Sequence, residues 1–284
     1  MNIEESWIQT NGIRLHVMQA GPQDGKPVVL LHGFPEFWYG WKKQMTALAE
    51  AGLRVIVPDQ RGYNLSDKPP GVRAYSLAEL TADITGLLDA LGHEKAYLAG
   101  HDWGAAVAWT LAIVRAERFH KLVILNVPHP RVMSDTVRRD PRQMLKSWYI
   151  GFFQLPRIPE ATLGARDCAG LTNLLRASGH ADTFSAADLA EYQKAWGQPG
   201  ALTGMVNWYR AILRHPPDMP ESPRVRIPTL MLWGTQDVAL ADWMARPSID
   251  YCDDGKLIFF EDATHWVQHD RAAEVSQLMI EFFK

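Results

Sequence analysis

The sequence predicts an α/β fold in which a mostly parallel sheet is flanked by helices and carries an inserted helical segment. Two observations predict it. Short apolar runs recur with longer helical patterns between them, and this alternation stops between residues 125 and 229. Helices bury both faces of a parallel sheet, so its strands are apolar throughout rather than alternating. The predicted strands are residues 28–31, 55–57, 96–99, 122–125, 229–233 and 257–260.

The remaining elements follow from the same patterns. Residues 7–10 and 13–20 predict an antiparallel pair that precedes the parallel strands. The longest apolar stretch, residues 103–114, is too short to span a bilayer and predicts a buried core helix. Helical patterns punctuated by Pro and Gly predict a helical cap domain over residues 130–216, inserted into a core domain of residues 1–129 and 217–284.

Composition excludes several classes of function. Of the 284 residues, 47% are hydrophobic, which is enough to bury a large core. A net charge of −3 without dense runs of Lys or Arg argues against a nucleic-acid partner. The first residues lack a basic start followed by an apolar run, so we expect a cytoplasmic protein without a membrane span. Cys168 and Cys252 lie far apart and outside metal-ligand spacing, so we expect no disulfide, no metal and no cofactor.

A sharp turn is predicted around Asp102. The strand 96–99 runs into the string GHDWG (100–104), and a helix of small apolar residues follows. Glycines at this spacing permit an elbow that exposes the central side chain above the sheet. Free N–H groups at the helix start stabilise the carboxylate, so Asp102 needs no base to become a nucleophile toward an sp³ carbon. The alternative, that Asp102 only caps the helix, is disfavoured by the two glycines.

A histidine late in the chain is the candidate base. Attack by Asp102 on carbon would leave an ester on its side chain, and this ester must then be hydrolysed. His265 follows the last predicted strand, and a neutral imidazole is the usual group that activates water against an ester. The chain has ten histidines, and His265 is singled out by its position and by the chain order nucleophile, acid, histidine. Asp237, after the strand 229–233, is the acid expected to fix the tautomer of His265. Its alternative interpretation is an ordinary turn residue.

The loop HGFPEFWY (32–39) is the expected source of an oxyanion hole. Phe34 is expected to donate its backbone N–H, and the backbone N–H of Trp103 is the second donor. Gly33 permits close approach, and Pro35 stiffens the turn and removes a competing donor. These donors should act when water attacks the ester, and Phe34, Pro35 and Trp103 are also expected to contact the substrate.

Two tyrosines of the predicted cap lie in apolar helical contexts. Tyr149 is in SWYIGFFQ, where residues 148, 149, 152 and 153 share one helical face, and Tyr209 is in MVNWYR. We expect both phenols to point inward. A phenol with a pKa of about 10 stays protonated at neutral pH and can donate to a developing alkoxide. A purely structural role in the core is the alternative.

Six strings along the chain resemble the epoxide hydrolases of the α/β-hydrolase fold. The resemblance implies that fold, with Asp102 as nucleophile and with Asp237 and His265 as the charge-relay pair. It further implies that Tyr149 and Tyr209 donate to the epoxide oxygen and that a cis peptide joins residues 34 and 35. The strings are HGFPEFWYGW, PDQRGYNLSDKP, GHDWGA, SWYIGFFQLP, VNWYR and ATHW.

The implied reaction opens a small epoxide to a vicinal diol through an ester on Asp102, which water then hydrolyses. The implied partners are a small apolar epoxide and water. Six tryptophans flank the site motifs and predict an aromatic-lined, mostly apolar pocket. These are the tryptophans at 38, 41, 103, 148, 208 and 266.

Four alternative functions are weaker. A haloalkane dehalogenase usually has Asn at the position of Phe34, and Trp103 alone would form a poor halide site. A fluoroacetate-type dehalogenase would need cationic side chains beside these motifs. A non-catalytic ligand-binding protein should have lost Asp102, His265 or Asp237. An esterase would need Ser in place of Asp102.

Overall fold

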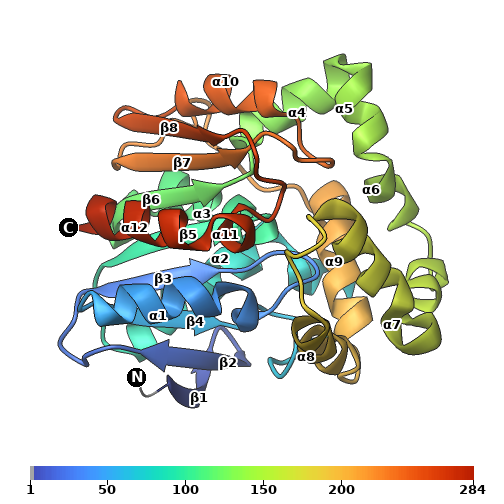
Figure 1. Ribbon diagram of the computed structural model, residues 1–284, viewed down its shortest axis with the longest axis horizontal. Coiled ribbons are helices and arrows are strands. Elements are labelled where there is room, and N and C mark those ends of the chain that lie inside the picture. Colours follow the sequence, from blue (N-terminus) through green and yellow to red (C-terminus); the bar gives the residue numbers. More distant parts are fainter. Residues whose placement is uncertain (1–2) are drawn as a thin grey trace.

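The computed structural model describes residues 3–284 and contains an eight-stranded sheet (Figure 1). Its order is β1-β2-β4-β3-β5-β6-β7-β8. β2 pairs antiparallel with β1 and with β4, and all the other neighbours are parallel. The strands are β1 (Ile3–Thr10), β2 (Ile13–Ala20), β3 (Pro27–Leu31), β4 (Arg54–Pro58), β5 (Ala96–His101), β6 (Phe119–Leu125), β7 (Thr229–Gly234) and β8 (Gly255–Phe260).

Helices cover both faces of the sheet. In Figure 1, α1 and α12 lie in front of the strands, and α2 and α3 lie behind them. The flanking helices are α1 (Lys42–Glu50), α2 (Leu77–Ala90), α3 (Trp103–Val114), α10 (Ala245–Ile249), α11 (Val267–Asp270) and α12 (Ala272–Phe283). Four short 3-10 helices join these elements: Trp38–Trp41, Val72–Tyr75, Ala116–Arg118 and Asp242–Met244. This layering explains why the inner strands are apolar at every position, as β4 and β5 are buried along their whole length.

The predicted fold class and strands are confirmed. Each apolar run falls within one of the strands β3 to β8, and the opening pair is antiparallel. The apolar stretch of residues 103–114 is helix α3, which packs against β5 and is mostly buried. Unbroken apolar runs therefore predicted correctly the strands that helices cover on both faces of the sheet.

A helical segment lies between β6 and β7. It comprises α4 (Pro130–Arg139), α5 (Pro141–Lys146), α6 (Trp148–Phe152), α7 (Ile158–Ser178), α8 (Ala186–Trp196) and α9 (Ala201–Arg214). In Figure 1 these helices run from the top of the molecule, where α4 and α5 lie, down its right side. Tyr192 and Trp208, from α8 and α9, are buried in the same core cluster as the strand residues. The segment is thus packed onto the sheet domain rather than held apart from it.

Candidate active site

The turn between β5 and α3 presents the side chain of Asp102. Asp102 has φ 49° and ψ −124°, a region that few residues other than glycine occupy. A Cβ on Gly100 would overlap the carbonyl oxygen of Gly104, and a Cβ on Gly104 would overlap that of Leu31. The two glycines are therefore required by close backbone approaches, and the strained residue between them projects a carboxylate.

The loop after β3 holds one oxygen of this carboxylate. The backbone N–H of Phe34 donates to Asp102 Oδ1 at 2.6 Å. A Cβ on Gly33 would overlap the Asp102 side chain, so only glycine allows this approach. The Phe34–Pro35 peptide is cis, as the resemblance implied. Trp103 is the first residue of α3, and an N–H at that position has no acceptor within its helix.

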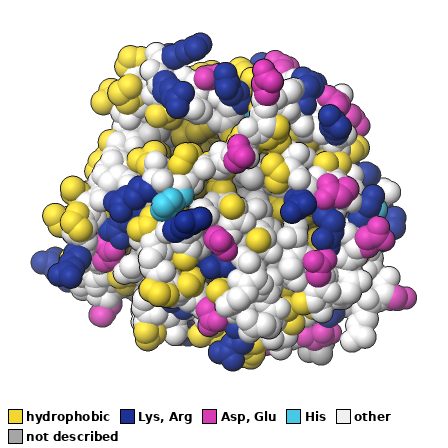
Figure 2. Space-filling model, turned by 180° about the vertical axis from the view of Figure 1, so that it is seen from behind, with side chains coloured by type: hydrophobic (Ala, Val, Ile, Leu, Met, Phe, Trp, Pro, Cys, Tyr) yellow, Lys and Arg dark blue, Asp and Glu magenta, His cyan; other side chains and the backbone are white. Residues whose placement is uncertain are grey.

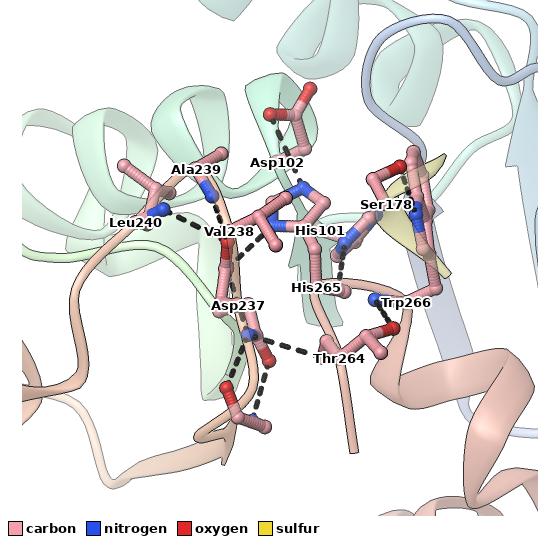
Figure 3. A network of polar contacts seen from close by, with 12 residues as sticks. His101, Asp102, Ser178, Asp237, Val238, Ala239, Leu240, Thr264, His265 and Trp266 are labelled. Atoms are coloured by element: carbon pink, nitrogen blue, oxygen red, sulfur yellow. Dashed lines mark hydrogen bonds and ion pairs between the residues drawn. The ribbon is translucent and has the colours of Figure 1, made fainter. Parts of the chain in front are cut away.

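His265 lies between two carboxylates (Figure 3). Its Nδ1 is 2.6 Å from Asp237 Oδ2, and its Nε2 is 3.6 Å from Asp102 Oδ2. Asp237 Oδ1 accepts the backbone N–H groups of Ala239 and Leu240 at 2.7 and 2.8 Å. The carboxylate is thereby held so that Nδ1–H donates to it and Nε2 faces Asp102. The structure thus brings together three predicted residues from the ends of three strands.

The charges of this trio set its protonation. Burial opposes a charge on the imidazole, but Asp237 and Asp102 together raise the pKa of His265 to about 10. Burial also opposes the charge on each carboxylate, yet the adjacent His265 holds the pKa of Asp102 and of Asp237 below the usual value. Near neutral pH, the free site therefore contains one imidazolium between two carboxylates.

Two tyrosines from the helical segment lie against each other near Asp102. The rings of Tyr149 on α6 and Tyr209 on α9 are 5.8 Å apart. The Tyr209 ring also lies 5.3 Å from that of Phe34 and 5.0 Å from that of Trp103. Burial and the charge of Asp102 raise the pKa of both phenols above its usual value. Both hydroxyls therefore stay protonated over the pH range in which Asp102 is ionised.

Comparisons with known proteins identify the family of this chain. Residues 26–272 match the family model described as alpha/beta hydrolase fold. The chain is 48% identical over 279 residues to the AB hydrolase superfamily protein YfhM of Bacillus subtilis (strain 168), covering 98% of this chain and 97% of that protein. It is 38% identical to Epoxide hydrolase 4 of Homo sapiens, covering 98% of this chain and 77% of that protein. The chain belongs to the epoxide hydrolase family of α/β-hydrolases.

A solved structure of the family has the same architecture. The crystal structure of the Bacillus megaterium epoxide hydrolase in complex with an inhibitor matches with a TM-score of 0.90. The two chains are 29% identical, and the match covers 98% of this chain and 99% of that chain. The α/β-hydrolase fold, and with it the assignment of the chain as a hydrolase, is thus supported by sequence and by structure.

A further buried carboxylate, Glu36, joins the loop after β3 to its surroundings. Glu36 is 1% exposed. It accepts hydrogen bonds from Tyr192 Oη at 2.6 Å, His269 Nε2 at 2.7 Å and Gln268 Nε2 at 3.0 Å. Burial would raise the pKa of Glu36, but the histidines His269 and His101 hold it well below its usual range. Because Tyr192 belongs to α8, this single anion links the helical segment to the sheet domain.

Replacing Glu36 by Gln should destabilise the protein by about 2–4 kcal/mol near pH 7, because the donors around it lose a buried anion. The folded-state pKa is lowered, so the contribution of Glu36 is complete above the unfolded pKa and is lost as pH falls toward the folded one. Urea unfolding at about pH 7 and about pH 3.5 should therefore show a smaller difference from wild type at the lower pH. An equal difference at both pH values, or an equal loss in the exposed control Glu117→Gln, would contradict this account.

Sequence reasoning missed Asn126. Its Nδ2 donates to Asp237 Oδ2 at 3.0 Å and to the Gly234 carbonyl oxygen at 3.1 Å, and its Oδ1 accepts the Gly234 N–H at 2.9 Å. Residues 126–129 contain no carboxylate and so offer no rival acid to Asp237. The available signal was position, because Asn126 follows β6, the strand beside the one that leads to Asp237. In the structure its amide ties the acid to both strand ends.

The tryptophans are placed only partly as predicted. Trp103 and Trp208 pack against each other beside Tyr209, with ring centroids 5.7 Å apart. Trp148 is 68% exposed, so the prediction that it shares the inward face of Tyr149 was wrong. Adjacent residues of a helix point about 100° apart, and here the phenol takes the inward direction. Trp41 is buried in the core cluster on the other side of the sheet, with residues of α1 and α12, and does not line the site.

Among residues 3–284, no three His, Cys, Asp or Glu side chains form a group that could hold a metal ion. Cys168 and Cys252 are buried free thiols. Within the same described range, no helix is both long enough and apolar enough to cross a bilayer.

Proposed function

We propose that this protein hydrolyses a small epoxide to a vicinal diol through a covalent ester on Asp102. One observation carries the proposal: a carboxylate occupies the elbow, and two protonated phenols of the helical segment lie near it. A carboxylate nucleophile suits displacement at an sp³ carbon. A strained three-membered ether needs, in addition, a proton donor for the oxygen that leaves the carbon, and the phenols supply it.

In the first step, Asp102 attacks one ring carbon of the epoxide. Oδ1 is held by the Phe34 N–H, so Oδ2 is the oxygen that forms the new C–O bond. The ring C–O bond breaks, and its electron pair stays on the epoxide oxygen. Tyr149 and Tyr209 donate hydrogen bonds to that oxygen, and one of them transfers its proton. The products of this step are an alkyl ester of Asp102, a new hydroxyl group and a tyrosinate.

Ester formation also prepares the base for the second step. Once Asp102 is esterified, its negative charge no longer raises the pKa of His265, so the imidazolium becomes a stronger acid. Its proton passes to the tyrosinate, which restores the phenol and leaves His265 neutral. The histidine is then a base only when there is an ester to hydrolyse. Asp237 and Asn126 keep the tautomer with Nε2 directed at the ester.

In the second step, His265 Nε2 removes a proton from water while the water oxygen attacks Cγ of the ester. The tetrahedral oxyanion accepts hydrogen bonds from the backbone N–H groups of Phe34 and Trp103. Collapse breaks the bond between Cγ and the ester oxygen, and the diol oxygen takes a proton from the imidazolium. Asp102 is released as the acid with one oxygen from water, and its proton passes to the neutral His265, which restores the carboxylate and the imidazolium. Protons and charges therefore balance over the cycle with this chain's own residues and water.

The helical segment should act as the cap of this site. We assign residues 130–216 to the cap and residues 1–129 and 217–284 to the core domain, because Tyr149 and Tyr209 come from the former and Asp102, Asp237 and His265 from the latter. Phe34, Pro35 and Trp103 would contact the substrate. The aromatic rings of Phe34, Phe153 and Trp103 around Tyr209 favour an apolar epoxide.

The test is to trap the ester. A His265→Gln variant incubated with terminal and disubstituted epoxides should gain the mass of one whole epoxide, and peptide mapping should locate it on Asp102. Hydrolysis is blocked because the amide cannot act as the base. The control His120→Gln, which changes an exposed histidine of β6, should turn over without retaining mass.

Two outcomes would contradict the proposal. A folded His265→Gln variant that gains an alkyl group from haloalkanes, and nothing from epoxides, would identify a dehalogenase. An adduct that maps to a residue other than Asp102 would show that Asp102 is not the nucleophile.

A further inference from the structure

Exposed hydrophobic side chains gather on one part of the surface. Of the twelve large hydrophobic side chains exposed within residues 3–284, five lie in the short stretch 144–158 of the helical segment. Leu145 is 73% exposed and Trp148 is 68% exposed, which makes them the two most exposed of the set. Met144, Leu155 and Ile158 complete the group. Scattered apolar residues need no explanation, but such clustering marks an interaction surface.

Two contacts join this group to exposed apolar residues that follow β7. Lys146 Nζ donates to the carbonyl oxygen of Val238 at 3.3 Å, and Val238 is 55% exposed. The guanidinium of Arg142 lies 4.3 Å from the ring centroid of Trp243, which is 40% exposed. We call residues 138–158, with Val238 and Trp243, the α4–α6 face. The α4–α6 face therefore combines exposed apolar side chains with basic ones.

The same segment is basic in an otherwise acidic protein. Residues 130–158 contain six Lys and Arg against two Asp, a net charge of +4, whereas the whole chain carries −3, so the remaining residues carry −7. Neither Arg138 nor Arg139 pairs with an acidic group among residues 3–284. Helix α5 lies at the upper right of Figure 1, which is the upper left of Figure 2 because that view is from behind. Hydrophobic and basic side chains lie next to each other there.

We propose that the α4–α6 face docks on a bilayer that contains anionic phospholipid. Exposed Trp and Leu side chains enter the headgroup boundary of a membrane, and neighbouring Arg and Lys bind the negative surface. The face has both sets of side chains on one strip, and its positive charge is complementary to that surface. No part of the chain needs to cross the bilayer for this contact.

Docking would also place the active site beside the lipid. Tyr149 points inward from α6, and its neighbour Trp148 points outward from the same helix. An apolar epoxide concentrated in the bilayer would then have one short helix between it and Asp102. This link to substrate supply rests on the proposed function, whereas the docking itself does not.

A second copy of the chain is a poorer occupant of this face. In a twofold contact the same patch meets itself, so a segment with a net charge of +4 would face a second segment of the same charge. Like charges at such a contact oppose association. An anionic bilayer offers the opposite charge together with an apolar layer, which matches both features of the face.

Flotation with vesicles tests the proposal. The full chain should float with phosphatidylcholine vesicles that contain phosphatidylglycerol and should not float with phosphatidylcholine alone. The double variant Arg138→Glu/Arg139→Glu should bind at least about tenfold more weakly, because it reverses two charges at the surface. The variant Met144→Gln/Leu145→Gln should also bind more weakly and should leave the dependence on phosphatidylglycerol in place.

Matched controls lie away from the α4–α6 face. Lys26→Glu/Lys95→Glu makes the same charge change before β3 and β5, and Leu65→Gln removes an exposed leucine elsewhere, so neither should change binding. Circular dichroism should show that all variants are folded. Absence of flotation, or equal loss in the Lys26/Lys95 control, would overturn the proposal. So would a wild-type dimer in sedimentation velocity that the Arg138/Arg139 variant dissociates, because the occupant would then be a second copy. Turnover of soluble epoxides is read separately, so failure of docking and failure of the proposed function are distinguishable.

Discussion

Replacing Asp102 by Asn is expected to lower kcat by at least about ten-thousandfold with any epoxide that the wild type converts. The amide keeps an oxygen for the Phe34 N–H and nearly the same shape, but it carries no negative charge with which to attack carbon. Loss of activity should therefore occur without loss of structure. Initial rates and circular dichroism measure the two quantities separately. Asp24→Asn, which changes an exposed carboxylate, is the control and should keep full activity.

The same variant tests how the trio is charged. Asp102 helps to raise the pKa of His265 to about 10, so its replacement by Asn should lower that pKa. NMR titration of the histidine ring in both proteins measures the change directly. The stabilisation that comes from a raised histidine pKa is complete below the unfolded value and is lost as pH rises through the folded one. The alkaline loss of stability should therefore begin at lower pH in the variant.

Two results with this variant would contradict the assignment of Asp102. Persistence of the wild-type His265 pKa would show that Asp102 does not control the base. Measurable turnover by the Asp102→Asn variant, after peptide mapping has shown that its new amide has not reverted to an acid, would remove Asp102 as nucleophile.

The double variant Tyr149→Phe/Tyr209→Phe should reduce the rate of ring opening by at least about a thousandfold. The phenyl rings preserve the packing of Phe34 and Trp103 against the site, and only the two hydroxyls are lost. Without a donor, the epoxide oxygen must leave as an unprotonated alkoxide in an apolar site. Each single variant should lose less, because the other phenol still donates.

The measurement is the rate of ester formation in the His265→Gln background, followed by intact mass. This background separates ring opening from hydrolysis, so the tyrosine variants should slow the appearance of the adduct rather than its decay. Tyr251→Phe changes a tyrosine that stacks on His129 away from the site and should leave the rate unchanged. Adduct formation at the wild-type rate in the double variant would mean that another group protonates the oxygen.

The sequence alone was enough to predict the α/β class, the strands and the residues that form the candidate site, because those signals are local. An apolar run marks a doubly covered strand, and the glycines beside Asp102 mark a turn in which any larger residue would overlap the backbone. Since the carboxyl ends of parallel strands meet at one edge, the order of Asp102, Asp237 and His265 along the chain also predicted that they would meet.

Tertiary structure decided the features that depend on contacts between distant parts of the chain. Asn126 binds Asp237 from 111 residues away, and Tyr192 binds Glu36 from 156 residues away, so no local spacing announces either bond. On the short helix α6 the sequence predicted that Tyr149 points inward, but it wrongly placed Trp148 on the same face. Both residues are aromatic and adjacent, and only the folded protein decided that Tyr149 packs against Tyr209 of α9 while the indole of Trp148 faces outward.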